Sequence, residues 1–156
     1  MKPVQVSVQV PFPREQVYEF LAISANHEPF NRHMLTDWSF SGPPRGVGSR
    51  THATATLGGR RDPVTIEVIE DVPPTRIVER NVGARGKRVA TGTYSLSATE
   101  AGTAIAFEYA WQRAPVSERL AGPLVRHMMR GALTTSMHEL AATLDSELAQ
   151  VNRPGA

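Results

Sequence analysis

The sequence PLVRHMMRGALTTSMHELAATLDSELAQ, residues 123–150, is the longest helical pattern in this chain. Its large apolar residues recur mostly at spacings of three and four, which places them along one side of a helix. They are Leu124, Met128, Leu133, Met137, Leu140, Leu144 and Leu148. The helix is predicted to begin at Pro123, because proline is tolerated in the first turn but not in the interior. A helix of this length needs a large apolar partner.

The rest of the chain supplies that partner as a predicted sheet. Valines 4, 6, 8 and 10 alternate with polar residues, which is typical of a half-buried strand. A short helix is predicted over 13–23, and the polar segment 24–33 is predicted to hold one irregular second helical turn. Six more alternating runs follow, from residue 37 to the turn at 42–46 and then over 49–57, 63–70, 76–82, 89–98 and 103–113. Seven strands and a closing helix indicate an α+β fold, with the helix over a curved antiparallel sheet.

Length and composition favour one domain without disulfides. The 156 residues include no cysteine, which excludes thiolate metal sites and cysteine nucleophiles and fits a reducing compartment. No window approaches the ~18 uninterrupted apolar residues of a membrane span, and the N-terminus lacks a signal core. We therefore expect a single cytoplasmic domain over 1–150, no membrane span, and a disordered tail over 151–156.

The charge pattern does not indicate a nucleic-acid surface. The formal net charge is +2, and the basic residues are not interleaved with aromatic residues that would stack on bases. Arg60 and Arg61, and the group Arg85, Lys87 and Arg88, lie beside glycines in predicted hairpin ends. Solvated charge is the ordinary expectation there, and no nucleic-acid partner is predicted.

Several short motifs resemble the START-related helix-grip superfamily (SRPBCC), and within it the polyketide cyclase/dehydrase-like family. The motifs cover nearly the whole chain and are VQVPFP at 8–13, NHEPF at 26–30, GVG at 46–48, EDVPPTR at 70–76, GTYSL at 92–96 and Gly102-Thr103. The resemblance implies a helix-grip fold: a seven-stranded curved antiparallel sheet wrapped around a long C-terminal helix, with two short helices after the first strand. It also implies a cavity between helix and sheet.

The resemblance implies a ligand as well. We expect a small hydrophobic molecule, polyketide-like or lipid-like, bound without cofactor or metal by a monomer or homodimer. Such a protein either catalyses cyclisation or dehydration or acts as a non-catalytic carrier or regulator. A third alternative is a packed interaction domain with no ligand. The packed domain should lack a cavity of ~300 Å³, a carrier should have an apolar cavity, and an enzyme should have polar groups converging inside it.

Two features depart from the family pattern. Many members carry a tryptophan after the first helix, where this chain has Phe30, so an indole N–H donor is lost. Aromatase/cyclases tend to place serine and arginine on the inward face of the strand that is 63–70 here. In this chain the inward residues are expected to be the aliphatic Val64, Ile66 and Val68, which weighs against a cyclase.

Glu79 is the most informative single residue. The alternation IVER at 77–80 places its carboxyl among inward positions, where burial would raise its pKa and suit it to general acid or base catalysis. A register slip of one residue would instead turn Glu79 to water and Arg80 inward. The candidate proton-transfer residues are Glu79 and Tyr94.

The expected ligand contacts combine the inner face of the sheet with neighbouring helices. They are Phe30, Met34, Trp38, Ile66, Glu79, Tyr94, Tyr109, His127 and Met128. Phe40 is also expected to face inward, in phase with Trp38. The first half of the long helix is the sparser and more adaptable half, so we expect a ligand to touch the helix there. The five histidines do not have metal-site spacing.

Overall fold

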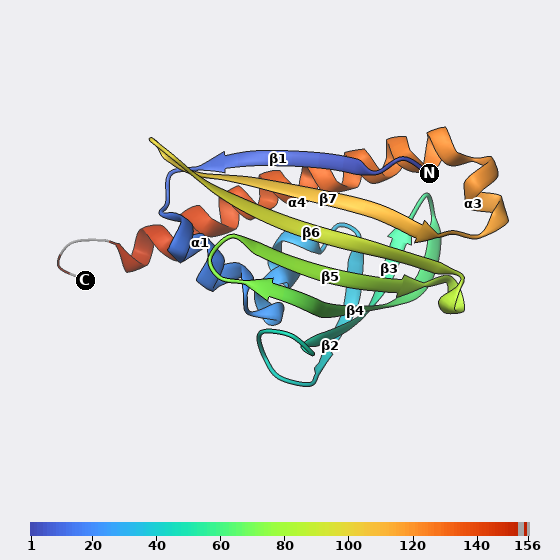
Figure 1. The fold of residues 1–156 in the computed structure, drawn as a ribbon, viewed down its shortest axis with the longest axis horizontal. Coiled ribbons are helices and arrows are strands. Elements are labelled where there is room, and N and C mark those ends of the chain that lie inside the picture. Colours follow the sequence, from blue (N-terminus) through green and yellow to red (C-terminus); the bar gives the residue numbers. More distant parts are fainter. Residues whose placement is uncertain (153–154, 156) are drawn as a thin grey trace.

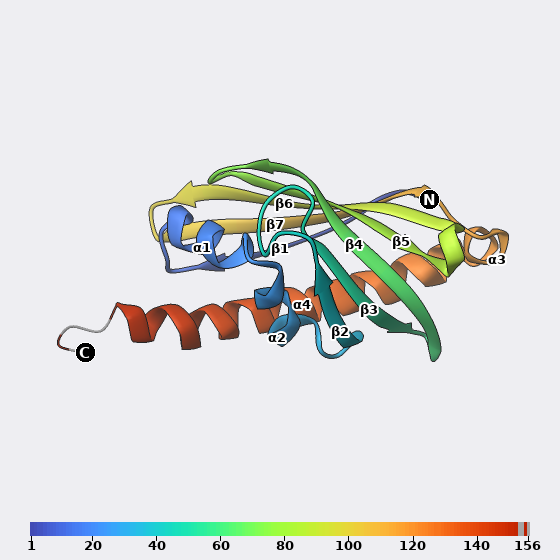
Figure 2. The same ribbon diagram turned by 90° about the horizontal axis from the view of Figure 1, so that it is seen from below.

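The computed structural model describes residues 1–152 and 155 of the chain. It consists of one curved antiparallel sheet with helices against one face (Figures 1 and 2). The strands are β1 (Val4–Val10), β2 (Leu35–Ser41), β3 (Arg50–Leu57), β4 (Arg60–Val72), β5 (Arg76–Gly83), β6 (Arg88–Thr99) and β7 (Gly102–Arg113). Their order in the sheet is β1-β7-β6-β5-β4-β3-β2. The fold class and all seven strands predicted from periodicity are confirmed.

The sheet is built from hairpins between consecutive strands, apart from the pairing of β1 with β7. That pairing joins Val4 to Tyr109 and Val10 to Thr103. Gly102 makes the last turn possible: its φ is +150°, and a Cβ there would collide with the Val10 carbonyl oxygen. Only glycine adopts this conformation readily, so the turn packs directly against the end of β1.

The C-terminal helix α4 (Gly122–Val151) runs along one face of the sheet, as predicted (Figure 2). Its 30 residues make it about 45 Å long. Its fully or almost fully buried apolar residues are Leu133, Met137, Leu140 and Leu144. Val151, placed in the predicted tail, is the last helical residue, and residues 153, 154 and 156 lie outside the described residues. No helix in the described part of the chain is both long and apolar enough to cross a membrane.

Three short helical segments complete this side of the molecule. The helix α1 (Arg14–Leu21) is followed by the 3-10 turn η1 (Ser24–His27) and the single turn α2 (Glu28–Asn31), which packs against α4. Near the other end of the sheet, the turn η2 (Ala84–Gly86) joins β5 to β6, and α3 (Val116–Leu120) precedes α4. Different short helical segments therefore lie at the two ends of the sheet, α1 at one end and α3 at the other (Figure 1).

Phe40 lies on the inner face of the sheet with Trp38, as expected, but it does not reach the space between sheet and helix. The pairing of β2 with β3 shifts register between Thr36 and Ser39, and Asp37 has a φ of +56°. This irregularity breaks the simple alternation of side chains along the strand. Beyond it, Phe40 pairs with the inward-facing Thr51, and its ring centroid lies 6.1 Å from that of Trp38. On this edge strand Phe40 is 44% exposed, whereas Trp38 reaches the space between sheet and helix.

Candidate functional site

A cavity of about 350 Å³ lies between the inner face of the sheet and α4. Its wall is mainly apolar and comes from the middle strands and from one side of the helix. Val64, Ile66 and Phe107 represent the sheet side, and Met128 and Met137 the helix side. Small-molecule sites typically occupy roughly 300–1,000 Å³. The cavity is therefore large enough for a small ligand and does not fit the packed-domain alternative.

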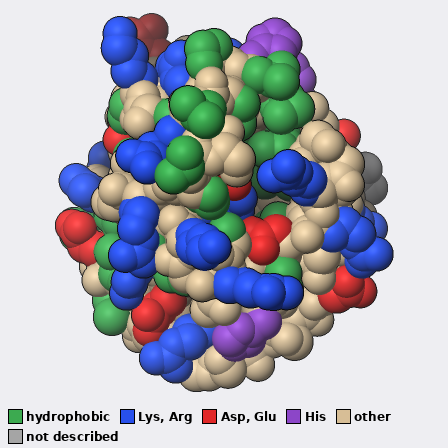
Figure 3. Space-filling model, turned by 90° about the vertical axis from the view of Figure 1, so that its right-hand side faces the viewer, with side chains coloured by type: hydrophobic (Ala, Val, Ile, Leu, Met, Phe, Trp, Pro, Cys, Tyr) green, Lys and Arg blue, Asp and Glu red, His purple; other side chains and the backbone are tan. Residues whose placement is uncertain are grey.

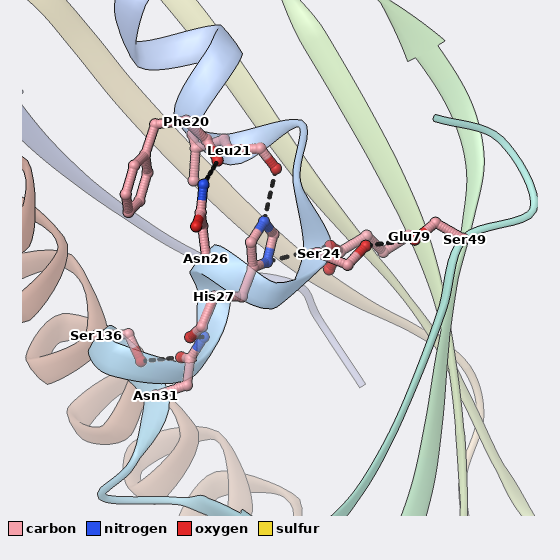
Figure 4. Close-up of polar contacts among 9 residues, drawn as sticks. All are labelled: Phe20, Leu21, Ser24, Asn26, His27, Asn31, Ser49, Glu79 and Ser136. Atoms are coloured by element: carbon pink, nitrogen blue, oxygen red, sulfur yellow. Dashed lines mark hydrogen bonds and ion pairs between the residues drawn. The ribbon is translucent and has the colours of Figure 1, made fainter. Parts of the chain in front are cut away.

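At its inner end the cavity contains a buried carboxyl and imidazole pair. Glu79, on β5, is 7% exposed, and its Oε1 lies 3.5 Å from Nδ1 of His27 at the end of η1 (Figure 4). The opposite ring nitrogen, Nε2, lies 2.7 Å from the Leu21 carbonyl oxygen. Because a carbonyl only accepts, Nε2 carries a hydrogen and donates it. In neutral His27 the lone pair is then on Nδ1, directed toward Glu79.

A set of buried polar contacts holds His27 in place. Asn31 donates from Nδ2 to the His27 carbonyl oxygen at 3.0 Å, and the Ser136 hydroxyl on α4 donates to Asn31 Oδ1 at 2.8 Å (Figure 4). On the other side of η1, the hydroxyls of Ser24 and Ser49 are 2.6 Å apart. These contacts fasten η1 and α2 to both α4 and the sheet. The imidazole is thus positioned by the scaffold before any ligand enters.

Burial raises the pKa of two side chains at the inner end of the cavity, Glu79 and Tyr94. Removal from water raises the pKa of the Glu79 carboxyl, and the nearby His27 opposes this rise. Burial also raises the pKa of the Tyr94 hydroxyl well above its usual value, with a further contribution from Glu79. The Tyr94 ring lies edge-on to His27, with 5.5 Å between ring centroids. Tyr94 therefore stays protonated near neutral pH and is suited to donate a hydrogen bond, not to act as a base.

A second charged cluster lies at the outer end of the cavity. Arg88 on β6 binds Asp62 of β4 through Nη1 at 2.8 Å. It also binds Glu118 of α3, with Nε 2.9 Å from Oε2 and a second contact from Nη2 to Oε1. Asp62 also accepts from the Ala84 backbone N–H at 2.6 Å. Arg88 therefore joins β6 to β4 and to α3, and its partner Asp62 joins the η2 turn to the same cluster.

The family model described as "Polyketide cyclase / dehydrase and lipid transport" matches residues 1–145. The chain belongs to this family. No functionally curated protein matches the sequence. The family assignment and the cavity agree with the resemblance found in the short motifs.

Solved structures share the fold of this family member at low sequence identity. Protein TTHA0849 from Thermus thermophilus is 17% identical with a TM-score of 0.73, covering 93% of this chain and 98% of its own. A ginseng (Panax ginseng) major latex-like protein is 9% identical with a TM-score of 0.69, over 90% of this chain and 95% of its own. DynU16, from the dynemicin biosynthetic locus, is 20% identical with a TM-score of 0.64, over 94% of this chain and 48% of its own.

Most of the residues predicted to contact a ligand line the cavity of this polyketide cyclase/dehydrase family member. They are Met34, Trp38, Ile66, Glu79, Tyr94, Tyr109 and Met128. The open question of register on β5 is resolved, since Glu79 is buried in the cavity wall and Arg80 is exposed. The expected aliphatic character of β4 also holds, with Val64 and Ile66 on the wall.

Three expectations about individual side chains are wrong. Phe30 does not line the cavity: it is fully buried behind His27, with 5.3 Å between the ring centroids. His127 is exposed and does not line it either, because the helical rotation of about 100° per residue turns it away from Met128. Arg88 is not a solvated hairpin charge, because it is ion-paired with Asp62 and Glu118.

Sequence reasoning missed four polar residues of the cavity wall. These are His27, Asn31, Asn81 and Ser136, all of which line the cavity. His27 and Asn31 lie in a polar segment without periodicity, so no local pattern indicates which side chains turn inward. Asn81 does carry a signal, because it follows Ile77 and Glu79 at the strand period of two.

Proposed function

We propose that this domain binds a small hydrophobic molecule, polyketide-like or lipid-like, in the cavity between the sheet and α4. The observation that carries the proposal is an apolar cavity of about 350 Å³ with polar groups gathered at its ends. Apolar walls provide the main favourable free energy of binding, and a few polar groups fix the ligand's orientation. Family membership supports the same class of function.

The inner end supports a ligand that carries an oxygen atom at one terminus. Glu79, when protonated, and Tyr94 each present an O–H group among apolar neighbours. A ketone, phenol or hydroxyl oxygen can accept from such donors, whereas a carboxylate ligand would place a second negative charge near Glu79. We therefore infer an uncharged polar group at this end of the ligand.

The binding proposal is tested by filling the cavity. Ile66→Trp should lower the affinity for the uncharged fluorescent probe N-phenyl-1-naphthylamine by about tenfold or more, which is about 1.4 kcal/mol. Ile69→Trp is the matched control, since Ile69 lies on the same strand but is exposed outside the cavity. Native mass spectrometry of protein purified from its own host then identifies the natural ligand. Equal probe affinities for the two variants would refute the proposed site.

The pair of Glu79 and His27 favours a second function, the dehydration that completes a cyclisation. Loss of water requires one group to accept a carbon-bound proton and another to donate a proton to the departing hydroxyl. With His27 Nδ1 as acceptor and protonated Glu79 as donor, the substrate loses one water molecule. The proton taken by His27 then returns to Glu79 across the 3.5 Å gap, which restores the starting state. Tyr94 would hold the substrate carbonyl oxygen.

Turnover of a linear or partly cyclised β-hydroxyketone substrate tests this second function. Glu79→Gln and His27→Phe should each reduce the rate of water loss by about 10²–10⁴-fold, the usual contribution of general acid–base catalysis. The binding affinity of the apolar probe should change little in Glu79→Gln. If wild type and Glu79→Gln turn over at equal rates, Glu79 has no part in the mechanism. If wild type shows no turnover, the domain is a carrier.

A further inference from the structure

The outer end of the cavity carries an exposed apolar patch. Val116 is 60% exposed, Leu120 is 82% exposed and Leu124 is 59% exposed. Val116 and Leu120 lie one turn apart on α3, and Leu124 lies in the first turn of α4. Single exposed leucines are common, but three large aliphatic residues within nine positions form a patch that water solvates poorly. We name Val116, Leu120 and Leu124 the portal patch.

The portal patch is continuous with the cavity. Leu124 both lines the cavity and is exposed, and Ser117 and Glu118 of α3 line the cavity between patch residues. Across the opening, the β3–β4 turn approaches α4 closely, since a Cβ on Gly58 would lie 3.1 Å from the Met128 sulfur atom. An apolar molecule leaving the cavity here would pass directly onto exposed aliphatic side chains.

Basic residues surround this end of the molecule. Three segments form it, 57–62, 84–88 and 113–126, and they are joined by contacts of Arg88 with Asp62 and Glu118. Together they contain eight Lys or Arg and two Asp or Glu, a net charge of +6 in a chain whose total is +2. Both acidic residues are ion-paired with Arg88. Figure 3 shows the hydrophobic and basic side chains side by side on this face.

We propose that the portal patch and its basic surround dock on an anionic lipid surface. Aliphatic side chains enter the boundary between headgroups and acyl chains, while Lys and Arg contact the anionic headgroups. The basic residues available for this are Arg60, Arg85, Lys87, Arg113 and Arg119, which are exposed and make no ion pair among the described residues. The cavity then opens toward the lipid, so an apolar ligand reaches it without crossing water. This loading role rests on the proposed ligand binding, but the docking does not.

A nucleic acid fits this surface less well than a lipid bilayer. Binding to single strands relies on aromatic side chains that stack on bases. The exposed apolar side chains here are aliphatic, and the exposed Phe40 lies on β2, outside the segments that form this end. Trp111 lies beside Arg85, Lys87 and Arg113, but it is half-buried and its indole nitrogen is out of contact with water. The exposed aliphatic side chains therefore favour acyl chains.

Co-sedimentation with vesicles tests the docking. The wild-type protein should bind vesicles of phosphatidylcholine mixed with phosphatidylserine, bind phosphatidylcholine alone weakly, and lose binding as salt is added. The double variants Val116→Ser/Leu120→Ser and Arg85→Glu/Lys87→Glu should each bind about tenfold more weakly or worse. Ile69→Ser/Val72→Ser is the matched control, because these exposed residues lie on β4 outside the three segments.

The same variants separate this proposal from the proposed function. Leu120 does not line the cavity, so Val116→Ser/Leu120→Ser should keep the wild-type affinity for N-phenyl-1-naphthylamine in solution. No vesicle binding at low salt, or equal binding by the patch and control variants, would overturn the docking while leaving ligand binding intact. Tighter binding to single-stranded DNA than to anionic vesicles would also overturn it and identify a nucleic-acid surface.

Discussion

At the scale of single residues, the inner end of the cavity depends on one carboxyl that the fold keeps out of water. Glu79 is buried in the wall, and its Oε1 lies 3.5 Å from Nδ1 of His27. Burial favours the neutral acid, and a protonated His27 favours the carboxylate. Burial is the larger of the two effects, so the pKa of Glu79 is raised, as the proposed role of hydrogen-bond donor or general acid requires.

Replacing Glu79 with glutamine should change how stability depends on pH. Because the pKa of Glu79 is raised in the folded protein, the native state holds this proton more tightly than the unfolded state. The contribution of Glu79 to the free energy of unfolding is therefore fully present below its unfolded pKa. It falls as pH rises toward the folded pKa, by about 1.4 kcal/mol for each unit between the two. Glutamine does not titrate, so the free energy of unfolding of Glu79→Gln should not fall with pH for this reason.

Urea unfolding over the acidic to neutral range measures this effect. The stability of Glu79→Gln relative to wild type should increase with pH and then become constant. Glu100→Gln is the control, because it removes an exposed carboxyl of the same kind. A difference between Glu79→Gln and wild type that is independent of pH would contradict the assignment.

At the scale of elements, α4 is divided into two functional halves. Its first half presents Val125, Met128 and Met129 to the cavity, and methionine adapts readily to irregular spaces. Its second half packs Leu140 and Leu144 fully into the core. The stretch around Leu133 to Met137 belongs to both, since these two residues are buried and also line the cavity. The helix therefore anchors the fold with one half and lines the cavity with the other.

Truncation of one leucine in each half should separate these roles. Leu140→Ala removes a fully buried side chain and should lower the free energy of unfolding by about 2–5 kcal/mol. Leu124→Ala, in the exposed first turn, should change it by no more than about 0.5 kcal/mol. Thermal or urea unfolding of both variants measures the two values. Equal losses would mean that the first half is as important for stability as the second.

At the scale of the whole molecule, Arg88 fastens the outer wall of the cavity. The α3 helix contributes Ser117 and Glu118 to that wall and is joined to the sheet through the Arg88 ion pairs. Burial and the neighbouring carboxylates raise the pKa of Tyr109 to about 12, so this wall residue stays neutral while Arg88 stays charged. This wall of the cavity is thus held together by contacts among elements that are distant in the chain.

Replacing Arg88 with methionine should speed the release of a bound probe. The change keeps an apolar stem but leaves Asp62 and Glu118 without their shared partner, which frees α3 from the sheet. Stopped-flow dissociation of N-phenyl-1-naphthylamine should become about tenfold faster or more, given about 1.5–3 kcal/mol for a charged hydrogen bond. Arg50→Met, which breaks the more exposed pair with Glu67, is the control. Unchanged dissociation in Arg88→Met would mean that α3 does not control exit.

The apolar alternation of the sequence was sufficient for the fold and for much of the cavity wall. It placed Ile66, Glu79, Tyr94 and Tyr109 on the inner face because the strands β4 to β7 keep a regular period of two there. It also placed Phe40 on the inner face, but it could not show that Phe40 lies on the edge strand, 44% exposed and outside the cavity wall. Helical phase did carry a signal against His127, which lies about 100° around the helix from Met128.

The sequence by itself determined the type and order of the elements and the presence of a carboxyl on the inner face. These features follow from local periodicity, which depends only on neighbouring residues. Only the tertiary structure decided which polar groups meet. His27 joins Glu79 from a segment without periodicity, and Arg88 joins Asp62 and Glu118 across the cavity mouth. Those pairings depend on strand register, sheet curvature and the seating of η1 and α3, which no local pattern encodes.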